Sequence, residues 1–352
     1  MKEKKILFER NNLFLIQNKI NSSFIICKTF SNNKRIIFTT LLFLVCLLYF
    51  YPKNNKSNFS WSKEKICFDK YDVKKYNEIK EKLKISECSL MWANQKEFLN
   101  GIIRKFKPRK FLEIGVFRGG SSIIILNAIN DIKGATLYSI DLDTDEKIGE
   151  CVNKYFPELS KNYKLYKGMI ATEFIEKIGN DIDMVLIDTA HYEPGEILDF
   201  LMILPFLKEN AVVIFHDIGN QITRSRNRRE WAPYIIFNGL RGEKYLPSGN
   251  FFLKHDIGAV LLDKNQKKYY HDYFRLLGGQ WQYFPKEIHI KQMRNFIKKY
   301  YDNECLIMFD EATEFNRRFV KNNPAQLIFN LLQIKLKLNF IINIFLLKYF
   351  LQ

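Results

Sequence analysis

The sequence LEIGVFRGGSS, residues 112–122, decides the fold. An apolar run over 110–115 is typical of a strand, and it stops at Gly115. Gly119 and Gly120 follow, and a serine then caps an expected helix over 121–129. Glycine allows a sharp turn and keeps side chains away from a ligand, while the start of a helix offers free N–H groups. The stretch therefore predicts a strand, a ligand-holding loop and a helix.

The spacing of this loop is GxxxGG, which differs from the GxGxxG pattern of dinucleotide-binding proteins. An acid, Glu113, stands two residues before the first glycine. A carboxylate at that place suits a cationic ligand group better than a pyrophosphate. The loop thus disfavours a dinucleotide-dependent oxidoreductase.

Strand-like runs recur along the chain at 136–140, 163–166, 183–187, 211–215 and 257–262, and helix-like runs occur at 97–106 and 196–207. This alternation predicts an α/β fold: a doubly wound, mostly parallel Rossmann-like sheet with helices on both faces. Ligands of such sheets bind at the carboxyl ends of the strands. The polar residues expected there are Glu113, Asp141, Asp188, His191, His216 and Asp217.

Asp141 ends the second expected strand. Its two carboxylate oxygens can bind two ribose hydroxyls. The alternative is that Asp141 caps a helix beginning in the run DLDTDE, residues 141–146.

Four motifs in this order, LEIGVFRGGSS, SIDLD, LIDTAH and VVIFHD, resemble the class I S-adenosylmethionine-dependent methyltransferases. The resemblance covers about residues 90–263 and is greatest to small-molecule and sugar O-methyltransferases. It implies that Asp141 and Asp188 contact the cofactor. It also implies a loop that holds the methionine part of the cofactor, formed by Glu113, Gly115, Val116, Gly119 and Ser121. Gly168-Met169 departs from the family, which often has Gly-Asp beside the adenine.

The resemblance also implies the reacting groups. His191 stands where catechol-type relatives have a lysine base, and an imidazole titrates near neutral pH. Asp188 and Asp217, with His216 as a further candidate, match a divalent metal site for Mg or Mn. The alternatives are a structural role for His191 and His216 and no bound metal.

Residues 219–229 carry four arginines and no acid. Arg224 and Arg226 are candidates to bind an acidic or phosphorylated acceptor, and Trp231 to stack on a sugar ring. The alternative is a solvated loop. We expect O-methylation of a small hydroxyl acceptor, such as a sugar of a surface glycan or its precursor.

The chain has 352 residues and a net charge of +17, and residues 1–70 hold 13 Lys/Arg against 4 Asp/Glu. Residues 36–51 are uncharged and apolar, which favours a single membrane anchor over a signal peptide or a buried helix. Flanking lysines, together with a cofactor made in the cytosol, favour a cytoplasmic catalytic domain. The basic excess is therefore assigned to membrane topology, and no nucleic acid is expected as a partner.

The expected segments are a basic segment (1–35), the anchor (36–51), a linker (52–66), the catalytic domain (67–263), a helical extension (264–325) and an apolar C-terminal helix (326–352). No chemistry is assigned to the extension. The six cysteines form no CxxC pair and are expected as free thiols, with a Cys67–Cys88 disulfide as the alternative.

Two other functions remain open. One is a membrane-bound scaffold that keeps the fold without activity, and the other is a methyltransferase acting on nucleic acid or protein. The sequence leaves the oligomeric state undetermined.

Overall fold

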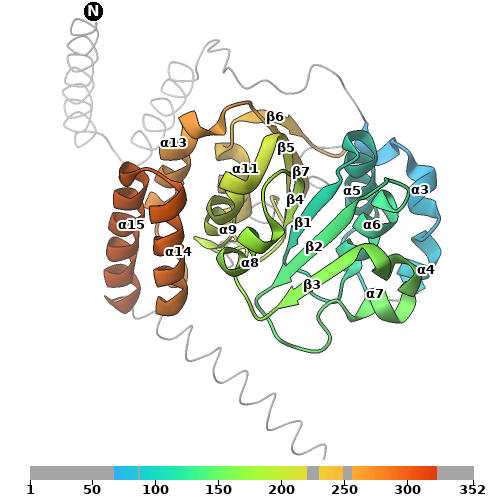
Figure 1. Ribbon diagram of the computed structural model, residues 1–352, viewed down its shortest axis with the longest axis horizontal. Coiled ribbons are helices and arrows are strands. Elements are labelled where there is room, and N and C mark those ends of the chain that lie inside the picture. Colours follow the sequence, from blue (N-terminus) through green and yellow to red (C-terminus); the bar gives the residue numbers. More distant parts are fainter. Residues whose placement is uncertain (1–66, 86–87, 220–229, 249–255, 323–352) are drawn as a thin grey trace, which may run out of the picture. The chain divides into compact units, whose positions relative to one another are not determined.

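The computed structural model describes residues 67–85, 88–219, 230–248 and 256–322. Its centre is a seven-stranded sheet of order β3-β2-β1-β4-β5-β7-β6. The strands are β1 (Lys110–Ile114), β2 (Thr136–Asp141), β3 (Tyr163–Lys167), β4 (Ile182–Ile187), β5 (Leu207–His216), β6 (Gly242–Tyr245) and β7 (Ile257–Leu262). Figure 1 shows this sheet with helices packed on both of its sides, as the sequence predicted.

The sheet is mixed. Strands β1 to β5 pair in parallel, whereas β7 runs antiparallel to both β5 and β6. The sequence analysis did not find β6, whose residues GEKY lack the apolar character of a strand. The segment forms a strand because it pairs with β7, although its residues have a low propensity for strands.

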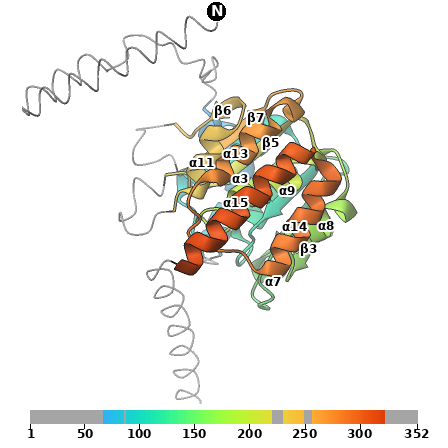
Figure 2. The ribbon, with the colours of Figure 1, turned by 90° about the vertical axis from the view of Figure 1, so that its left-hand side faces the viewer.

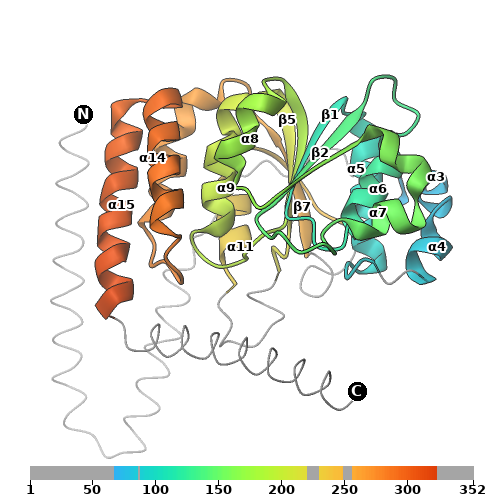
Figure 3. The same cartoon turned by 60° about the horizontal axis from the view of Figure 1, so that its bottom comes forward.

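One face of the sheet is covered by α5 (Ala93–Phe106), α6 (Gly120–Ile129) and α7 (Glu150–Tyr155), with α3 (Val73–Asn77) and α4 (Lys80–Ile85) outside them. The other face is covered by α8 (Ala171–Ile178), α9 (Gly195–Ile203) and α11 (Ala232–Gly239). Figure 3 shows these layers side by side. Side chains alternate between two cores along β1, because Phe111 packs into one core and Leu112 into the other.

The predicted C-terminal extension is helical: α13 (Tyr270–Arg275), α14 (Glu287–Tyr300) and α15 (Asn303–Asn322). Figure 2 shows α14 and α15 in front of α8 and α9. Gln292 on α14 donates a 3.0 Å hydrogen bond to Glu173 on α8, and Lys299 forms a 2.8 Å ion pair with Glu176. The short 3₁₀ turns are η1 (Phe68–Lys70), η2 (Pro157–Asn162), η3 (Leu204–Phe206), η4 (Gln266–Tyr269) and η5 (Leu276–Gly278).

The predicted membrane anchor at 36–51 lies outside the described residues, as do the segments 1–35, 52–66 and 326–352. Among the helices of the described residues, none combines the length and apolarity that crossing a membrane requires.

The expectation of free thiols throughout is wrong. Cys88 and Cys151 form a disulfide, with Cα atoms 6.1 Å apart, and Cys67 and Cys305 are free thiols. The alternative Cys67–Cys88 pairing is therefore wrong as well. Sixty-three residues separate Cys88 from Cys151, and only the packing of the segment before α5 against α7 brings them together.

Candidate active site

The loop between β1 and α6 has the tight geometry that its glycines suggested. Gly115 has a φ of +87°, and a Cβ there would lie 1.8 Å from the carbonyl oxygen of Asp188. The position therefore requires glycine, for both its backbone conformation and the close approach of the chain after β4. A side chain on Gly120 would likewise meet the backbone of Cys88 and Ser89.

Glu113 lies beneath this loop and does not line the cavity above it. Its carboxylate accepts hydrogen bonds from the hydroxyls of Ser121 at 2.6 Å, Ser122 at 2.7 Å and Ser139 at 2.6 Å. Burial raises the pKa of Glu113 to about 7, although the three serine hydroxyls favour the ionised form. In the structure, Glu113 therefore joins β1, β2 and α6 from below the loop.

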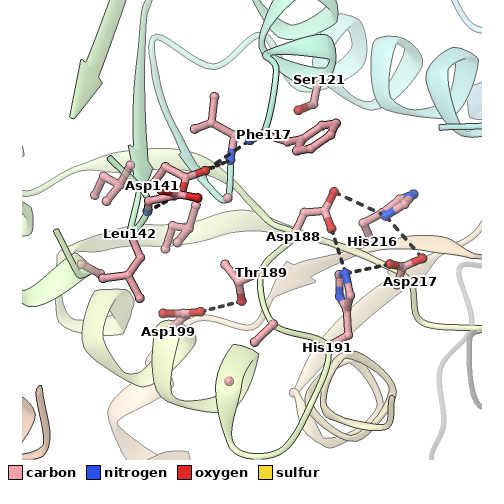
Figure 4. A pocket seen from close by; sticks show the side chains of 18 of the residues that line it. Phe117, Ser121, Asp141, Leu142, Asp188, Thr189, His191, Asp199, His216 and Asp217 are labelled. Carbon is pink, nitrogen blue, oxygen red and sulfur yellow. Dashed lines mark hydrogen bonds and ion pairs between the residues drawn. The ribbon is translucent and has the colours of Figure 1, made fainter. Parts of the chain in front are cut away.

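Asp141 lies at the end of β2 and faces the same loop (Figure 4). Its Oδ2 accepts hydrogen bonds from the backbone N–H groups of Val116 at 2.8 Å and Phe117 at 3.2 Å. Its Oδ1 accepts another from the N–H of Asp143 at 2.9 Å. Asp141 thus holds the loop in position, and a carboxylate has further lone pairs for a ligand.

A second polar group lies at the ends of β4 and β5. His191 Nε2 is 3.0 Å from Asp217 Oδ2 and 3.8 Å from Asp188 Oδ1. His216 Nδ1 is 3.4 Å from Asp188 Oδ2 and 3.6 Å from Asp217 Oδ1. Figure 4 shows the two imidazoles and two carboxylates facing one another. The structure therefore brings together the four residues that the sequence analysis named as candidate base and metal ligands: Asp188, His191, His216 and Asp217. This cluster is called the reacting end below.

The charges in this group are strongly coupled. Burial opposes a positive charge on His191, but hydrogen bonds to Asp217 and Glu196 and the charge of Asp188 outweigh it and raise the pKa to about 10. The pKa of His216 is likewise raised, mainly by Asp188, despite burial. The two histidines in turn hold the pKa of Asp217 well below its ordinary value against the effect of burial. In this arrangement both rings are cationic near neutral pH.

The sequence analysis missed Glu196, which lies in the first turn of α9 and is fully buried. Its Oε1 accepts a 2.6 Å hydrogen bond from the His191 backbone N–H and lies 3.2 Å from His191 Nδ1. An acid five residues after a candidate base was the available signal. Glu196 therefore holds the imidazole ring of His191 in place. The backbone of His191 adopts a left-handed conformation, with a φ of 60°.

Asp141 and the four residues at the ends of β4 and β5 line one cavity of about 1060 Å³. This volume is large enough for a nucleoside-sized cofactor together with part of a second ligand. Predicted residues that line it are Gly115, Val116, Ser121, Asp141, Asp188, His191, His216 and Asp217. Gly119 and Trp231 do not line it, and Arg224 and Arg226 lie outside the described residues. Lining residues that the sequence analysis missed include Trp92, Thr189, Asp199, Asp256, Tyr283 and His289.

The reacting end offers ligands that suit a divalent cation. Asp188, His191 and Asp217 each place one donor atom within 4.8 Å of the others. Two carboxylates and an imidazole suit manganese, iron or zinc, and with added water also magnesium. His216 is outside this set of three, yet neither of its buried ring nitrogens has a hydrogen-bond partner in the described part of the chain.

Several solved structures resemble this chain at low identity. TomG from Streptomyces achromogenes, an O-methyltransferase involved in tomaymycin synthesis and solved with SAM, is 18% identical; the match covers 57% of this chain and 91% of TomG, with a TM-score of 0.39. An O-methyltransferase from Bacillus cereus in complex with SAH is 15% identical over 62% of this chain and 96% of its own, with a TM-score of 0.41. Cofactor-bound Rv0187 from MTB is 17% identical over 55% and 92%, with a TM-score of 0.42.

No curated protein matches the sequence. Residues 112–218, however, match a family described as a methyltransferase domain, and this segment runs from the glycine loop to the residue after Asp217. The match identifies the class of this segment: residues 112–218 form a methyltransferase domain.

Proposed function

We propose that this enzyme transfers the methyl group of S-adenosylmethionine to a hydroxyl oxygen of a small acceptor, such as a sugar of a surface glycan or its precursor. The observation that carries the proposal is the group of Asp188, His191, His216 and Asp217 beside the cofactor loop in one cavity. The sulfonium methyl is already activated, so the protein has to align the hydroxyl oxygen and remove its proton.

The carboxylates of Asp188 and Asp217 fit a divalent cation, which they would hold with His216, leaving His191 free to act as the base. Such a cation, when bound, lowers the pKa of a hydroxyl near it. His191 lines the cavity and has Glu196 behind its other ring nitrogen, so its Nε2 is the atom placed to accept a proton.

The base function of His191 depends on the charges around it. With Asp188, Asp217 and Glu196 all acting on the ring, its pKa of about 10 leaves the imidazole protonated and unable to act as a base. Carboxylates that share their charge with a metal cation attract the imidazolium less, which returns the ring toward its ordinary titration range. The metal and the base are therefore linked parts of this proposal.

The test is methyl transfer by the purified full chain, supplied with S-adenosylmethionine and either Mg²⁺ or Mn²⁺ and offered sugars with vicinal hydroxyls as acceptors. Mass spectrometry of the acceptor identifies the methylated atom. Methylated product that depends on the metal supports the proposal. Cofactor binding without transfer to any hydroxyl acceptor would instead favour a scaffold of the same fold.

We also propose that residues 36–51 anchor the enzyme in a membrane with the catalytic domain on the cytoplasmic side. The uncharged apolar run and its lysine-rich flanks support the anchor. The Cys88–Cys151 disulfide is more typical of an oxidising compartment, so it argues against this orientation. Protease protection of the catalytic domain in intact vesicles of known orientation decides between the two sides.

A further inference from the structure

A second cluster of possible metal ligands lies in the C-terminal extension. His271, Asp302 and Cys305 each place one donor atom within 4.8 Å of the others. His271 belongs to α13, whereas Asp302 directly precedes α15 and Cys305 lies in the first turn of that helix. None of the three lines the cavity. The cluster is therefore separate from the reacting end, in the part of the chain to which the sequence analysis assigned no chemistry.

The start of α15 brings a carboxylate and a thiol together. Asp302 Oδ1 accepts a 2.9 Å hydrogen bond from the backbone N–H of Cys305, as the side chain of a residue at the start of a helix commonly does. This bond uses one carboxylate oxygen. The other, Oδ2, lies 2.8 Å from His271 Nε2, on a residue 31 positions earlier in the chain. The imidazole and the carboxylate thus meet beside the sulfur atom.

The ring of His271 has a second carboxylate at its other nitrogen. His271 Nδ1 lies 3.5 Å from Glu304 Oε2. Histidines that bind metals usually donate their second ring N–H to such a group, which fixes the orientation of the ring and makes the first nitrogen a better ligand. Glu304 therefore favours the tautomer in which the lone pair of Nε2 faces Asp302 and Cys305.

The cluster has one packed side and one side open to solvent. Cys305 is fully buried, and it belongs to the same core as Tyr270 and Phe274. The ring of Tyr301 packs against both of these residues, with centroids 4.6 Å from Tyr270 and 4.9 Å from Phe274. The side chain of His271, by contrast, is 37% exposed and that of Asp302 is 54% exposed. The sulfur is thus held in place, and an ion can enter from the open side.

The three donor types indicate which ion fits. A thiolate, an imidazole and a carboxylate are the ligands of zinc, which binds them tetrahedrally with water in the fourth position. Magnesium and calcium prefer oxygen ligands alone. One thiolate and one carboxylate balance the two positive charges of zinc, so the positive end of the α15 dipole does not oppose binding. The Cys305 thiol releases its proton to solvent as the zinc–sulfur bond forms.

We propose that His271, Asp302 and Cys305 bind a zinc ion that links α13 to the start of α15, with Glu304 orienting the ring of His271. The inference does not rest on the proposed function, because it needs neither the cofactor nor the methyl acceptor.

The site gives the extension a cross-link that the cavity depends on. Further along α15, the side-chain oxygen of Asn316 accepts a 2.8 Å hydrogen bond from the backbone N–H of Trp281. Trp281 lies just before Tyr283 and Phe284, which line the cavity. A zinc ion that fixes the start of α15 therefore stabilises the helix that holds this part of the cavity wall.

The test uses Co²⁺ as a spectroscopic probe for zinc, on the purified full chain after EDTA treatment and dialysis. Cobalt bound to a thiolate shows a sulfur-to-metal charge-transfer band in the near ultraviolet, which nitrogen and oxygen ligands do not give. The unaltered protein should gain this band with Co²⁺ and lose it when Zn²⁺ displaces the cobalt. Cys305→Ser should not gain it.

Two further variants test the other side chains. His271→Gln should weaken Co²⁺ binding, followed by the band, by about 100-fold or more, and Glu304→Gln by about tenfold. The matched control is Cys67→Ser. Cys67 is also a free thiol beside a carboxylate, 3.3 Å from Asp69 Oδ1, but it belongs to neither cluster of three candidate ligands found among the described residues. This variant should keep the full band and affinity.

The effect on stability is measured in an Asp188→Asn background, so that the reacting end contributes little to zinc binding. Zinc at about 100 times its Kd should raise the melting temperature by about 5 °C, and adding His271→Gln should remove that rise. Asp188→Asn alone should leave the cobalt–thiolate band unchanged, which separates this site from the metal of the proposed function.

Three results would overturn the zinc site: no band in the unaltered protein, a band that persists in Cys305→Ser, or unchanged cobalt affinity in His271→Gln. Circular dichroism checks that each variant is folded. If the buried Cys305→Ser change prevents folding, the partly exposed His271→Gln decides the question alone.

Discussion

The acids at the ends of β1 and β2 and those at the ends of β4 and β5 are held in different ways. At β1 and β2, each acid is matched by neutral donors: three serine hydroxyls surround Glu113, and three backbone N–H groups surround Asp141. At β4 and β5, acids face imidazoles, and His216 keeps two buried ring nitrogens without a hydrogen-bond partner in the described part of the chain. The first group is fixed by its own hydrogen bonds and keeps only lone pairs of Asp141 for a ligand, whereas the second also has the ring nitrogens of His216 left to bind one.

This difference predicts different roles for the two groups. A group whose hydrogen bonds are already satisfied keeps its shape whether or not a ligand is bound. When several charged side chains of both signs lie close together, the binding of a further charge, such as a metal ion, changes their protonation. We therefore expect the β1–β2 end to bind cofactor in a fixed way and the β4–β5 end to respond to metal and pH.

The largest effect is expected from Asp188→Asn. The change removes a charge that acts on both histidines and a candidate metal ligand, so methyl transfer should fall by about 1000-fold. Binding of S-adenosylhomocysteine should change by less than about fivefold if the two ends are independent, and by more if Asp188 also contacts the cofactor, as the resemblance implies. The measurements are kcat with radiolabelled cofactor and calorimetry.

The matched control is Asp181→Asn, the same chemical change on an exposed residue just before the amino end of β4. Asparagine tolerates the positive φ of 65° at that position. Activity should be unaltered. An equal loss of cofactor affinity and turnover in Asp188→Asn would show that the division between the two ends is wrong.

Removing divalent metal should separate the two ends without any substitution. Treatment with EDTA should lower turnover by about 100-fold or more, while affinity for S-adenosylhomocysteine should stay within about threefold. Adding Mn²⁺ or Mg²⁺ back should restore turnover. Full activity in thoroughly chelated enzyme would rule out the metal part of the proposal.

The same contrast explains what the sequence could predict. The loop and Asp141 are local: a strand end, a glycine and an acid in the right order indicate them, and the parallel core follows from alternating strand and helix patterns. Contacts between distant segments were not predictable in this way. Gln282 forms a hydrogen bond with Glu193, 89 residues away, and Cys88 forms a disulfide with Cys151, 63 residues away. No local sequence pattern predicts either contact.

The reacting end falls between these cases. Asp188, His191 and Asp217 were indicated one by one, because each follows a strand. Their mutual distances and the buried Glu196 behind His191 depend on how β4, β5 and α9 pack, which one sequence does not specify. The protonation of His191, set by three carboxylates, was for the same reason not foreseen.

Gly115→Ala should damage both ends at once, because Gly115 is where the loop after β1 touches the chain after β4. Its Cβ would lie 1.8 Å from the Asp188 carbonyl oxygen, so the backbone has to move, at an expected loss of about 3 kcal/mol or more in the free energy of unfolding. Gly134→Ala is the control: φ is +76° there, but nothing lies within 4 Å.

Gly134→Ala should therefore show only the conformational penalty, about 1 kcal/mol. Urea denaturation of both variants measures the difference. If both variants lose the same free energy of unfolding, the backbone near Gly115 and Asp188 can move apart at little cost in stability. The two ends would then be less tightly joined than the structure indicates.

The smallest effect concerns Glu113, and it tests whether the β1–β2 end is as self-contained as its hydrogen bonds suggest. Burial raises the pKa of Glu113 to about 7 from an ordinary value of 4.5. Between these values the folded protein holds a proton that the unfolded chain has released. This contribution to stability is complete below pH 4.5 and is lost as the pH rises through 7, about 3 kcal/mol in all.

Glu113→Gln removes that titration while keeping groups that hydrogen-bond to serine. The free energy of unfolding of the unaltered protein, minus that of the variant, should therefore fall between pH 4.5 and 7. Taking this difference cancels Asp199, whose pKa is raised by burial in the same window, because Asp199 is present in both proteins. A difference that stays level across the window would mean that the three serine hydroxyls keep Glu113 ionised in spite of its burial. The β1–β2 end would then carry a buried charge, as the β4–β5 end does, and the contrast between them would lie in the donors alone.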